Sequence, residues 1–146
     1  FSPYEAVLNF TVTYNGDCVL SLFFDRYEYT GGAHGNTLRF SDTWRLPSGR
    51  CLPVSAFIAR PVYYKTYLID KVIEQMEQNI ASARATYFEP CKSNAIETFH
   101  GKNYFLTPKG LVVYYQQYDI APYSSGIQHF LIPYSRTVLK PRCDRH

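Results

Sequence analysis

One segment of this chain, residues 61–84, has the periodicity of an amphipathic helix. Its apolar side chains recur every four residues, at Leu68, Val72, Met76 and Ile80, with charged and amide side chains between them. This spacing places the apolar side chains on one face of a helix, which then packs against another element. We therefore interpret the stripe as core packing rather than as a cofactor site. Pro61 suits the first helical turn, where its missing N–H costs no hydrogen bond.

Strand-like segments lie on both sides of this helix. Residues 5–14 and 18–29 are rich in β-branched and aromatic types, and Asn15-Gly16 between them favours a tight hairpin turn. Further strands are expected at 37–44, 103–107, 111–115 and 128–134. Between two of them, Gly110 is expected in the left-handed conformation of a three-residue hairpin loop. This order predicts an α+β fold: a mainly antiparallel β-sheet with one long amphipathic helix packed on a face.

Length and composition suit one domain over residues 1–146. The chain is 46% hydrophobic and 17% aromatic, enough to bury a core, and the aromatic residues most simply line a β-sheet. A net charge of +3, spread along the chain, argues against nucleic-acid binding, which usually shows a stronger basic stripe. No apolar run approaches the length needed to cross a membrane.

The four cysteines have no spacing typical of a metal site. They are Cys18, Cys51, Cys91 and Cys143. Because no CxxC pair or Cys/His cluster occurs, zinc binding is not expected. Outside the cytoplasm these residues could form two disulfides in any of three pairings, and the alternative is four free or buried thiols.

No motif in the sequence specifies a reaction. The nucleophile, metalloprotease and phosphate-binding motifs with recognisable spacing are absent. His34 could act as a general base, although a lone histidine in a turn is more often structural. Asp25, Glu28 and Asp119 could work as acid and base only if the fold brought them together. We therefore expect no catalytic residue, no metal and no cofactor, and a binding domain rather than an enzyme.

Two loops have the most unusual composition, residues 31–36 and 119–126. Loops held on a rigid scaffold often carry function, and a rigid tyrosine suits protein recognition. The alternative is a pair of ordinary turns in which the glycines serve the backbone. The binding residues that we expect here are Gly32, His34, Asp119, Pro122, Tyr123 and Ser124.

Several segments in a fixed order resemble one bacterial family. They are residues 27–35, 46–57, 104–115, 118–126 and 132–134. Together they are similar to the RsiV-like domain of unknown function, the outer domain of RsiV-type anti-sigma factors, which is also attached to cell-wall polysaccharide deacetylases. The resemblance spans about residues 27–135 and implies that residues 1–26 are the end of an upstream companion domain. The chain departs from the family pattern in its four cysteines and at Arg50-Cys51, where lysine is common.

The resemblance also implies a function and a location. The expected function is that of a non-catalytic binding or sensor domain on the bacterial envelope, in a secreted, lipid-modified or membrane-anchored parent protein. RsiV-type proteins act as receptors for lysozyme, so the implied partner is a lysozyme-type protein or a cell-wall glycan. The alternative is an accessory domain of a cell-wall polysaccharide deacetylase.

Overall fold

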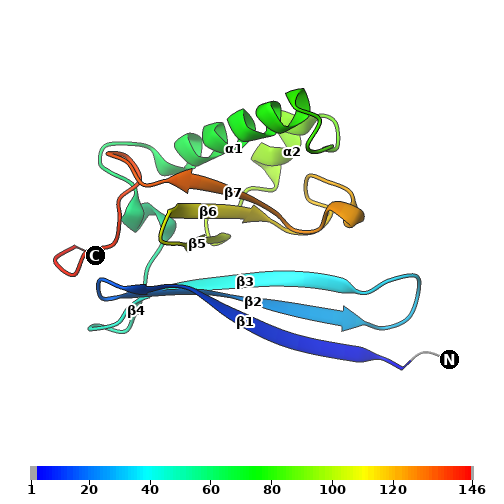
Figure 1. Cartoon of the computed structure of the whole chain (residues 1–146), viewed down its shortest axis with the longest axis horizontal. Coiled ribbons are helices and arrows are strands. Elements are labelled where there is room, and N and C mark those ends of the chain that lie inside the picture. The colour runs from blue at the N-terminus through cyan, green and yellow to red at the C-terminus, as the bar shows by residue number, and fades with distance from the viewer. Residues whose placement is uncertain (1–2, 146) are drawn as a thin grey trace.

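The computed structural model describes residues 3–145 and has an α+β fold built from two antiparallel sheets and two helices (Figure 1). The first sheet has the order β1-β2-β3-β4, and the second has the order β5-β6-β7. Their bounds are β1 Glu5–Gly16, β2 Val19–Tyr29, β3 Asn36–Arg45, β4 Arg50–Cys51, β5 Tyr104–Leu106, β6 Gly110–Tyr115 and β7 Gln128–Pro133. The helices are α1 Tyr64–Ala81 and α2 Cys91–Glu97, with 3-10 turns at Val54–Phe57 and Tyr123–Ser125.

Strand β6 lies at the centre of the molecule, and all six of its residues are buried. Its alternate side chains face two different partners, because successive residues of a strand point to opposite faces. Leu111, Val113 and Tyr115 join the main core with the buried stripe of α1. Val112 and Tyr114 face the first sheet, where they pack with Phe105 and Phe23. The second sheet is therefore a middle layer between α1 and the first sheet (Figure 1).

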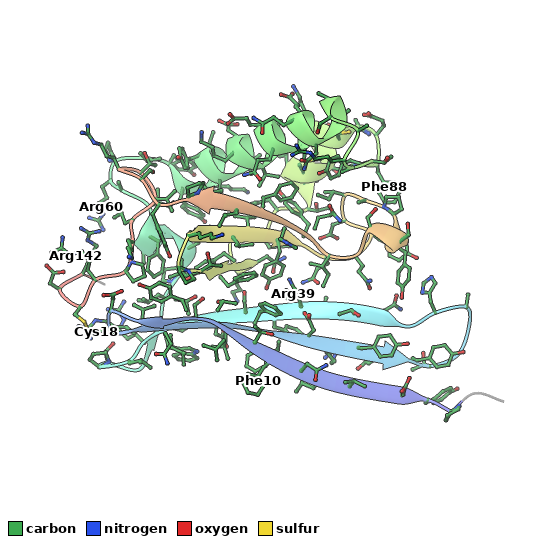
Figure 2. All side chains as sticks on the ribbon, in the orientation of Figure 1. Phe10, Cys18, Arg39, Arg60, Phe88 and Arg142 are labelled. Carbon is green, nitrogen blue, oxygen red and sulfur yellow. A yellow bond between two sulfur atoms is a disulfide. The ribbon has the colours of Figure 1, made fainter. Side chains whose placement is uncertain are left out.

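The outer face of the first sheet is apolar and uncovered within residues 3–145. Phe10, Phe24 and Phe40 lie side by side across β1, β2 and β3. Leu8 and Phe10 are 66% and 67% exposed. The position of Phe10 on the side away from the second sheet is visible in Figure 2. Large uncovered apolar patches on a sheet commonly mark a surface that another structural element covers.

The predicted helix was correct in its core, but its start was wrong. α1 begins at Tyr64, whereas Pro61 lies in the preceding turn after a cis peptide bond with Arg60. The helix ends at Ala81, where Ala83 adopts a left-handed φ of 54° and the Arg84 N–H donates to the Asn79 carbonyl. A second helix, α2, was not predicted. Its seven residues are too few to show a periodic apolar pattern.

The first hairpin turns two residues later than predicted. β1 continues through Gly16, and the turn residues are Asp17 and Cys18, with φ of 51° and 64°. Both values fit a primed turn, which matches the twist of a hairpin. Gly110 was also predicted wrongly, since it pairs with Pro133 inside β6. An added Cβ there would lie 2.8 Å from the Pro133 Cα, so the close approach of β7 requires glycine.

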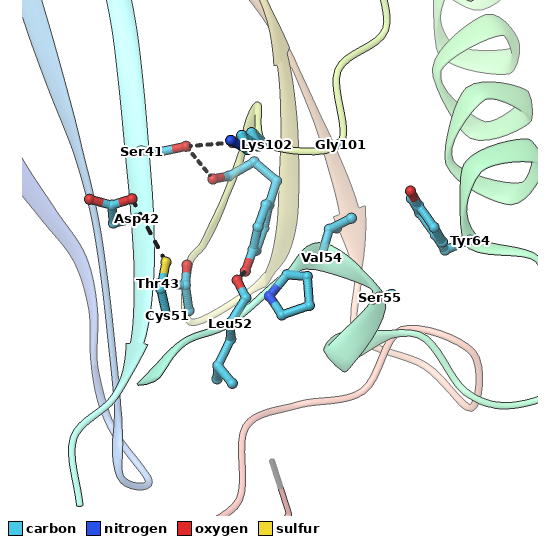
Figure 3. Close-up of a pocket in the computed structure, with 12 residues that line it drawn as sticks. Ser41, Asp42, Thr43, Cys51, Leu52, Val54, Ser55, Tyr64, Gly101 and Lys102 are labelled. Atoms are coloured by element: carbon cyan, nitrogen blue, oxygen red, sulfur yellow. Dashed lines mark hydrogen bonds between the residues drawn. The ribbon is translucent and has the colours of Figure 1, made fainter. Parts of the chain in front are cut away.

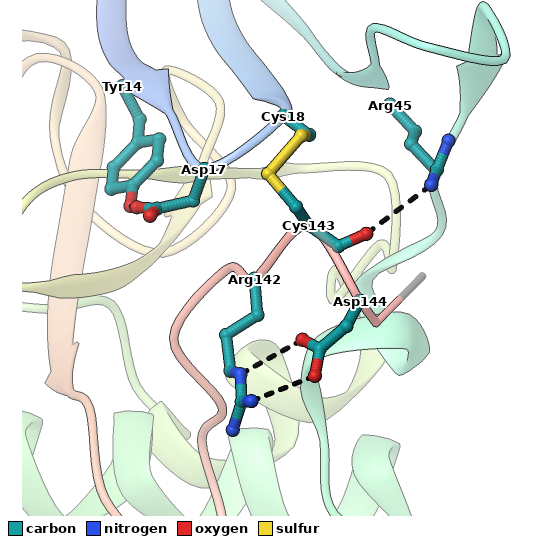
Figure 4. The surroundings of a disulfide bond; sticks show 7 residues. All are labelled: Tyr14, Asp17, Cys18, Arg45, Arg142, Cys143 and Asp144. Atoms are coloured by element: carbon teal, nitrogen blue, oxygen red, sulfur yellow. Dashed lines mark hydrogen bonds and ion pairs between the residues drawn. A yellow bond between two sulfur atoms is a disulfide. The ribbon is translucent and has the colours of Figure 1, made fainter.

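One disulfide joins the first hairpin to the C-terminal segment of the described chain. Cys18 in the hairpin turn is bonded to Cys143 in the C-terminal segment, 125 residues later (Figure 4). Arg45 adds a hydrogen bond of 3.4 Å to the Cys143 carbonyl. Of the two disulfides that the sequence allows, one is present within residues 3–145, and Cys51 and Cys91 are free thiols. None of the helices within residues 3–145 is long and apolar enough to span a membrane.

Candidate functional site

The two loops singled out in the sequence lie together at one end of the molecule. The loop after β2 places the His34 ring flat against the Tyr123 ring, with centroids 3.7 Å apart and planes at 16°. Tyr118 completes the group: its ring centroid is 5.7 Å from that of Tyr123, and its hydroxyl lies 3.3 Å from His34 Nε2. We call His34, Tyr118 and Tyr123 the aromatic cluster.

Side-chain contacts with one backbone carbonyl hold the cluster in place. The Tyr123 hydroxyl donates to the Gly35 carbonyl at 2.8 Å, and His34 Nδ1 lies 3.0 Å from the same oxygen. An added Cβ on Gly35 would collide with the ring of Tyr27, so only glycine lets the backbone approach this closely. The stacked rings are therefore fixed before any partner arrives.

Two glutamine side chains bind the segment before Tyr118 to the edge of β3. Gln116 Oε1 accepts from the Arg39 N–H at 2.9 Å, and Gln116 Nε2 donates to the Arg39 carbonyl at 2.7 Å. Gln117 Oε1 accepts from the Thr37 N–H at 2.8 Å. These amides pair with β3 as a neighbouring strand would. The cluster therefore rests on a sheet edge rather than on a free loop.

The remaining predicted site residues have mixed positions. Asp119 Oδ2 accepts from the Gln116 N–H at 3.0 Å, and burial raises the pKa of this carboxyl. Gly32 has a φ of 93°, and its carbonyl accepts from the Tyr29 hydroxyl at 2.9 Å. Pro122 and the exposed Ser124 belong to the same turn as Tyr123. The contacts of Asp119 and Gly32 shape the two loops, whereas the exposed His34 ring stacks on the half-buried ring of Tyr123.

Tyr118 is the site residue that we did not single out in the sequence. It is 49% exposed and has a left-handed φ of 69°, which turns the chain beside the cluster. A shallow hollow of about 240 Å³ adjoins it, lined by Arg26, Glu28, Asn36, Thr37, Leu38, Gln117 and Tyr118. In the sequence, the one indication that Tyr118 belongs to the site was its position three residues before the Ala121-Pro122 turn.

The carboxylates considered as acid or base are engaged separately. Asp25 forms a bidentate ion pair with Arg39, at 2.8 and 2.9 Å. Glu28 pairs with Arg26 at 3.3 Å, and Asp119 holds its own turn. Within residues 3–145, no three His, Cys, Asp or Glu side chains gather in a group that could hold a metal ion. The fold therefore does not bring Asp25, Glu28 and Asp119 together as an acid–base pair.

Comparison with known families identifies the fold. Residues 57–135, more than half of the chain, match the model of a family described as a protein of unknown function, DUF3298. The chain belongs to the DUF3298 family. Residues 1–37 match a second family model, described as deacetylase PdaC. The broader part of the predicted resemblance is thereby confirmed, and closeness to the RsiV-type members in particular stays a prediction.

Two solved structures share the DUF3298 fold. A family member from Pseudomonas aeruginosa is 20% identical with a TM-score of 0.68, covering 94% of this chain and 63% of its own. One from Bacteroides fragilis is 26% identical with a TM-score of 0.66, covering 90% of this chain and 51% of its own. This chain therefore spans about half to two thirds of the length of these relatives. No match was found among curated proteins.

Proposed function

We propose that this DUF3298 chain is a non-catalytic, extracytoplasmic binding domain, an accessory part of a larger envelope protein related to deacetylase PdaC. Its aromatic cluster contacts a cell-wall glycan. The observation that carries this proposal is the His34–Tyr123 stack, with Tyr118 beside it, held at the surface by hydrogen bonds to Gly35.

The chemistry of the cluster suits a sugar ring. Tyrosine and histidine combine a flat apolar face with a polar edge, so they contact both the C–H face and the hydroxyl groups of a pyranose. The hollow beside Tyr118 supplies further polar groups, including Asn36 and Gln117. Because the rings are already fixed, binding loses little conformational freedom, which favours affinity.

The accessory role is supported by the first sheet. Its first two strands lie in the segment that matches the deacetylase PdaC model, and the two solved relatives are longer than this chain. The outer face around Phe10 and Phe40 gives the domain an apolar surface for packing on another part of a larger protein. An oxidising compartment is supported by the Cys18–Cys143 disulfide, since such bonds persist mainly outside the cytoplasm.

The test is a calorimetric titration with soluble peptidoglycan fragments and with N-acetylglucosamine oligomers. We expect saturable binding that Tyr123→Ala and His34→Ala weaken at least tenfold. Tyr63→Ala is the matched control, because Tyr63 is an exposed tyrosine outside the cluster. Binding that survives both cluster substitutions would remove the cluster from the site.

A C-type lysozyme forms the second arm of the titration. This is the partner implied by the resemblance to RsiV-type proteins. Lysozyme binding that depends on His34 and Tyr123, without glycan binding, would overturn the glycan proposal in favour of a protein partner. If the cluster variants bind both ligands as well as wild type does, or if wild type binds neither ligand, the aromatic cluster has no recognition role.

A further inference from the structure

A cavity of the described chain lies away from the aromatic cluster, beside the edge of β3. It has a volume of about 570 Å³, within the range of ligand-binding sites. Its walls are the end of β3, the segment from Cys51 to Ser55, Tyr64 at the start of α1, and the segment Gly101–Tyr104 (Figure 3). We call it the edge cleft.

Hydrogen bonds join the walls of the edge cleft and fix their positions. The Ser41 hydroxyl donates to the Tyr104 carbonyl at 2.6 Å and lies 2.8 Å from the Tyr114 hydroxyl. On the other side, the Tyr104 hydroxyl donates to the Leu52 carbonyl at 2.6 Å. The cleft is therefore a fixed feature of the packing between the two sheets.

The edge of β3 is occupied at both ends but open in the middle. At one end, Gln116 and Gln117 bond to the main chain of Arg39 and Thr37. At the other end, the Leu52 N–H donates to the Thr43 carbonyl at 2.7 Å. Because main-chain groups alternate in direction along a strand, the odd-numbered residues of β3 direct these groups away from β2. Ser41 lies between the two occupied stretches and directs its N–H and carbonyl into the edge cleft.

Two opposite charges stand at this opening without an ion-pair partner among the described residues. Asp42 accepts a weak hydrogen bond from the Cys51 thiol at 3.9 Å. Lys102 lines the cleft on the side of Ser41. Successive residues of β3 face opposite sides of the sheet, so Asp42 lies on the outer side and Ser41 on the inner side.

We propose that the edge cleft binds a short extended peptide, which adds to β3 by pairing one residue with the main chain of Ser41. Strand addition at an open sheet edge is a general mode of peptide recognition. The residue opposite Ser41 points to the inner side and meets Lys102, so it is acidic. Its neighbours point to the outer side and meet Asp42, so they are basic. This site is separate from the aromatic cluster and does not depend on the proposed glycan function.

The two free thiols of the chain can report whether a peptide binds in the edge cleft. Cys51 is an exposed thiol on the wall of the edge cleft, and Cys91 is a free thiol in a different cavity. The probe is acetyl-Lys-Glu-Lys-amide, and acetyl-Glu-Lys-Glu-amide has the reversed charge pattern. We expect the first peptide to slow maleimide labelling of Cys51 at least threefold and to leave the labelling rate of Cys91 unchanged. N-methylation of its central residue, which removes the backbone donor, abolishes the protection.

Charge variants test which peptide positions must be acidic and which must be basic. Asp42→Asn should lower the affinity for acetyl-Lys-Glu-Lys-amide about fivefold, which is the upper value expected for one cross-strand charge pair. The double variant Asp42→Lys with Lys102→Glu prefers the reversed peptide. Lys109→Gln, in the exposed β5–β6 loop, is the control and leaves both affinities unchanged. Equal protection by both peptides, no protection by either, or an unchanged preference in the double variant would overturn the proposal.

Discussion

The imidazole of His34 stacks on the phenol ring of Tyr123. The Tyr123 hydroxyl also donates a hydrogen bond to the carbonyl of Gly35, which lies 88 residues earlier in the sequence. The stack joins the β2–β3 loop to the turn before β7. It is therefore both a surface feature and a link between the two sheets. Substitutions on its two sides separate these roles.

Tyr123→Phe keeps the ring and removes the hydrogen bond to Gly35. We expect the free energy of unfolding to fall by about 1 kcal/mol, the usual net value of one such bond. Ligand affinity should fall much less than in Tyr123→Ala, because the stacking face remains. Urea denaturation and calorimetric titration of both variants measure the two effects. Tyr63→Phe, at an exposed tyrosine outside the cluster, is the matched control and should leave both values unchanged.

The half-buried carboxyl of Asp119 makes stability depend on pH. Burial raises its pKa above the ordinary 3.8, so the folded state binds this proton more tightly than the unfolded state. Stability from this group is thus fully present below pH 3.8 and is lost as the pH rises through the folded pKa. We expect wild type to gain stability relative to Asp119→Asn as the pH is lowered from neutral. Urea denaturation across this range measures it, and a difference that does not change with pH would contradict the assignment.

Features set by local sequence were predicted well. The apolar stripe around Leu68 and Val72 specifies α1, since it repeats over several turns and buries one face. Alternating and β-branched runs specify the long strands. The two loops were recognised by composition, and the structure brings His34 and Tyr123 together.

Features set by distant contacts were not predictable in the same way. The division into two sheets depends on how β5 packs against the first sheet, where the Leu106 N–H donates to the Ser21 hydroxyl. The hairpin turn lies at Asp17 and Cys18 rather than at Asn15 and Gly16. A bulge between Val12 and Tyr14 shifts the register between β1 and β2. The choice of Cys143 as the partner of Cys18 likewise depends on the path of the whole chain.

The Cys18–Cys143 disulfide should be the largest single contributor to stability. It closes a loop of 125 residues, and the chain-entropy model assigns about 4–5 kcal/mol to a loop of this size. Cys143→Ser should lower the midpoint of urea denaturation accordingly, and reductant should have the same effect on wild type. A Cys51→Ser, Cys91→Ser double variant is the control, because neither thiol is bonded. Equal midpoints with and without reductant would show that the bond does not form.

Phe10 and Phe23 test the two faces of the first sheet. Phe23 packs on Phe105 with ring centroids 5.0 Å apart, and Arg39 lies 3.9 Å above its ring. Phe23→Ser should therefore lower the free energy of unfolding by about 2 kcal/mol or more. Phe10→Ser, on the uncovered face, should change it by less than about 0.5 kcal/mol. It should also reduce the binding of a hydrophobic dye such as ANS, and unchanged dye fluorescence would argue against an exposed apolar surface there.

Gly110→Ala should destabilise the second sheet by direct collision. Gly110 pairs with Pro133, and an added Cβ would lie 2.8 Å from the Pro133 Cα and even nearer to the Ile132 carbonyl. These contacts are with backbone, so β7 would have to move, at a cost of about 3 kcal/mol. Gly101→Ala is the matched control, since its Cβ would meet only side-chain atoms at 3.6 Å or more. Thermal unfolding of both variants decides the point, and equal melting temperatures would mean that β7 lies farther from β6 than described.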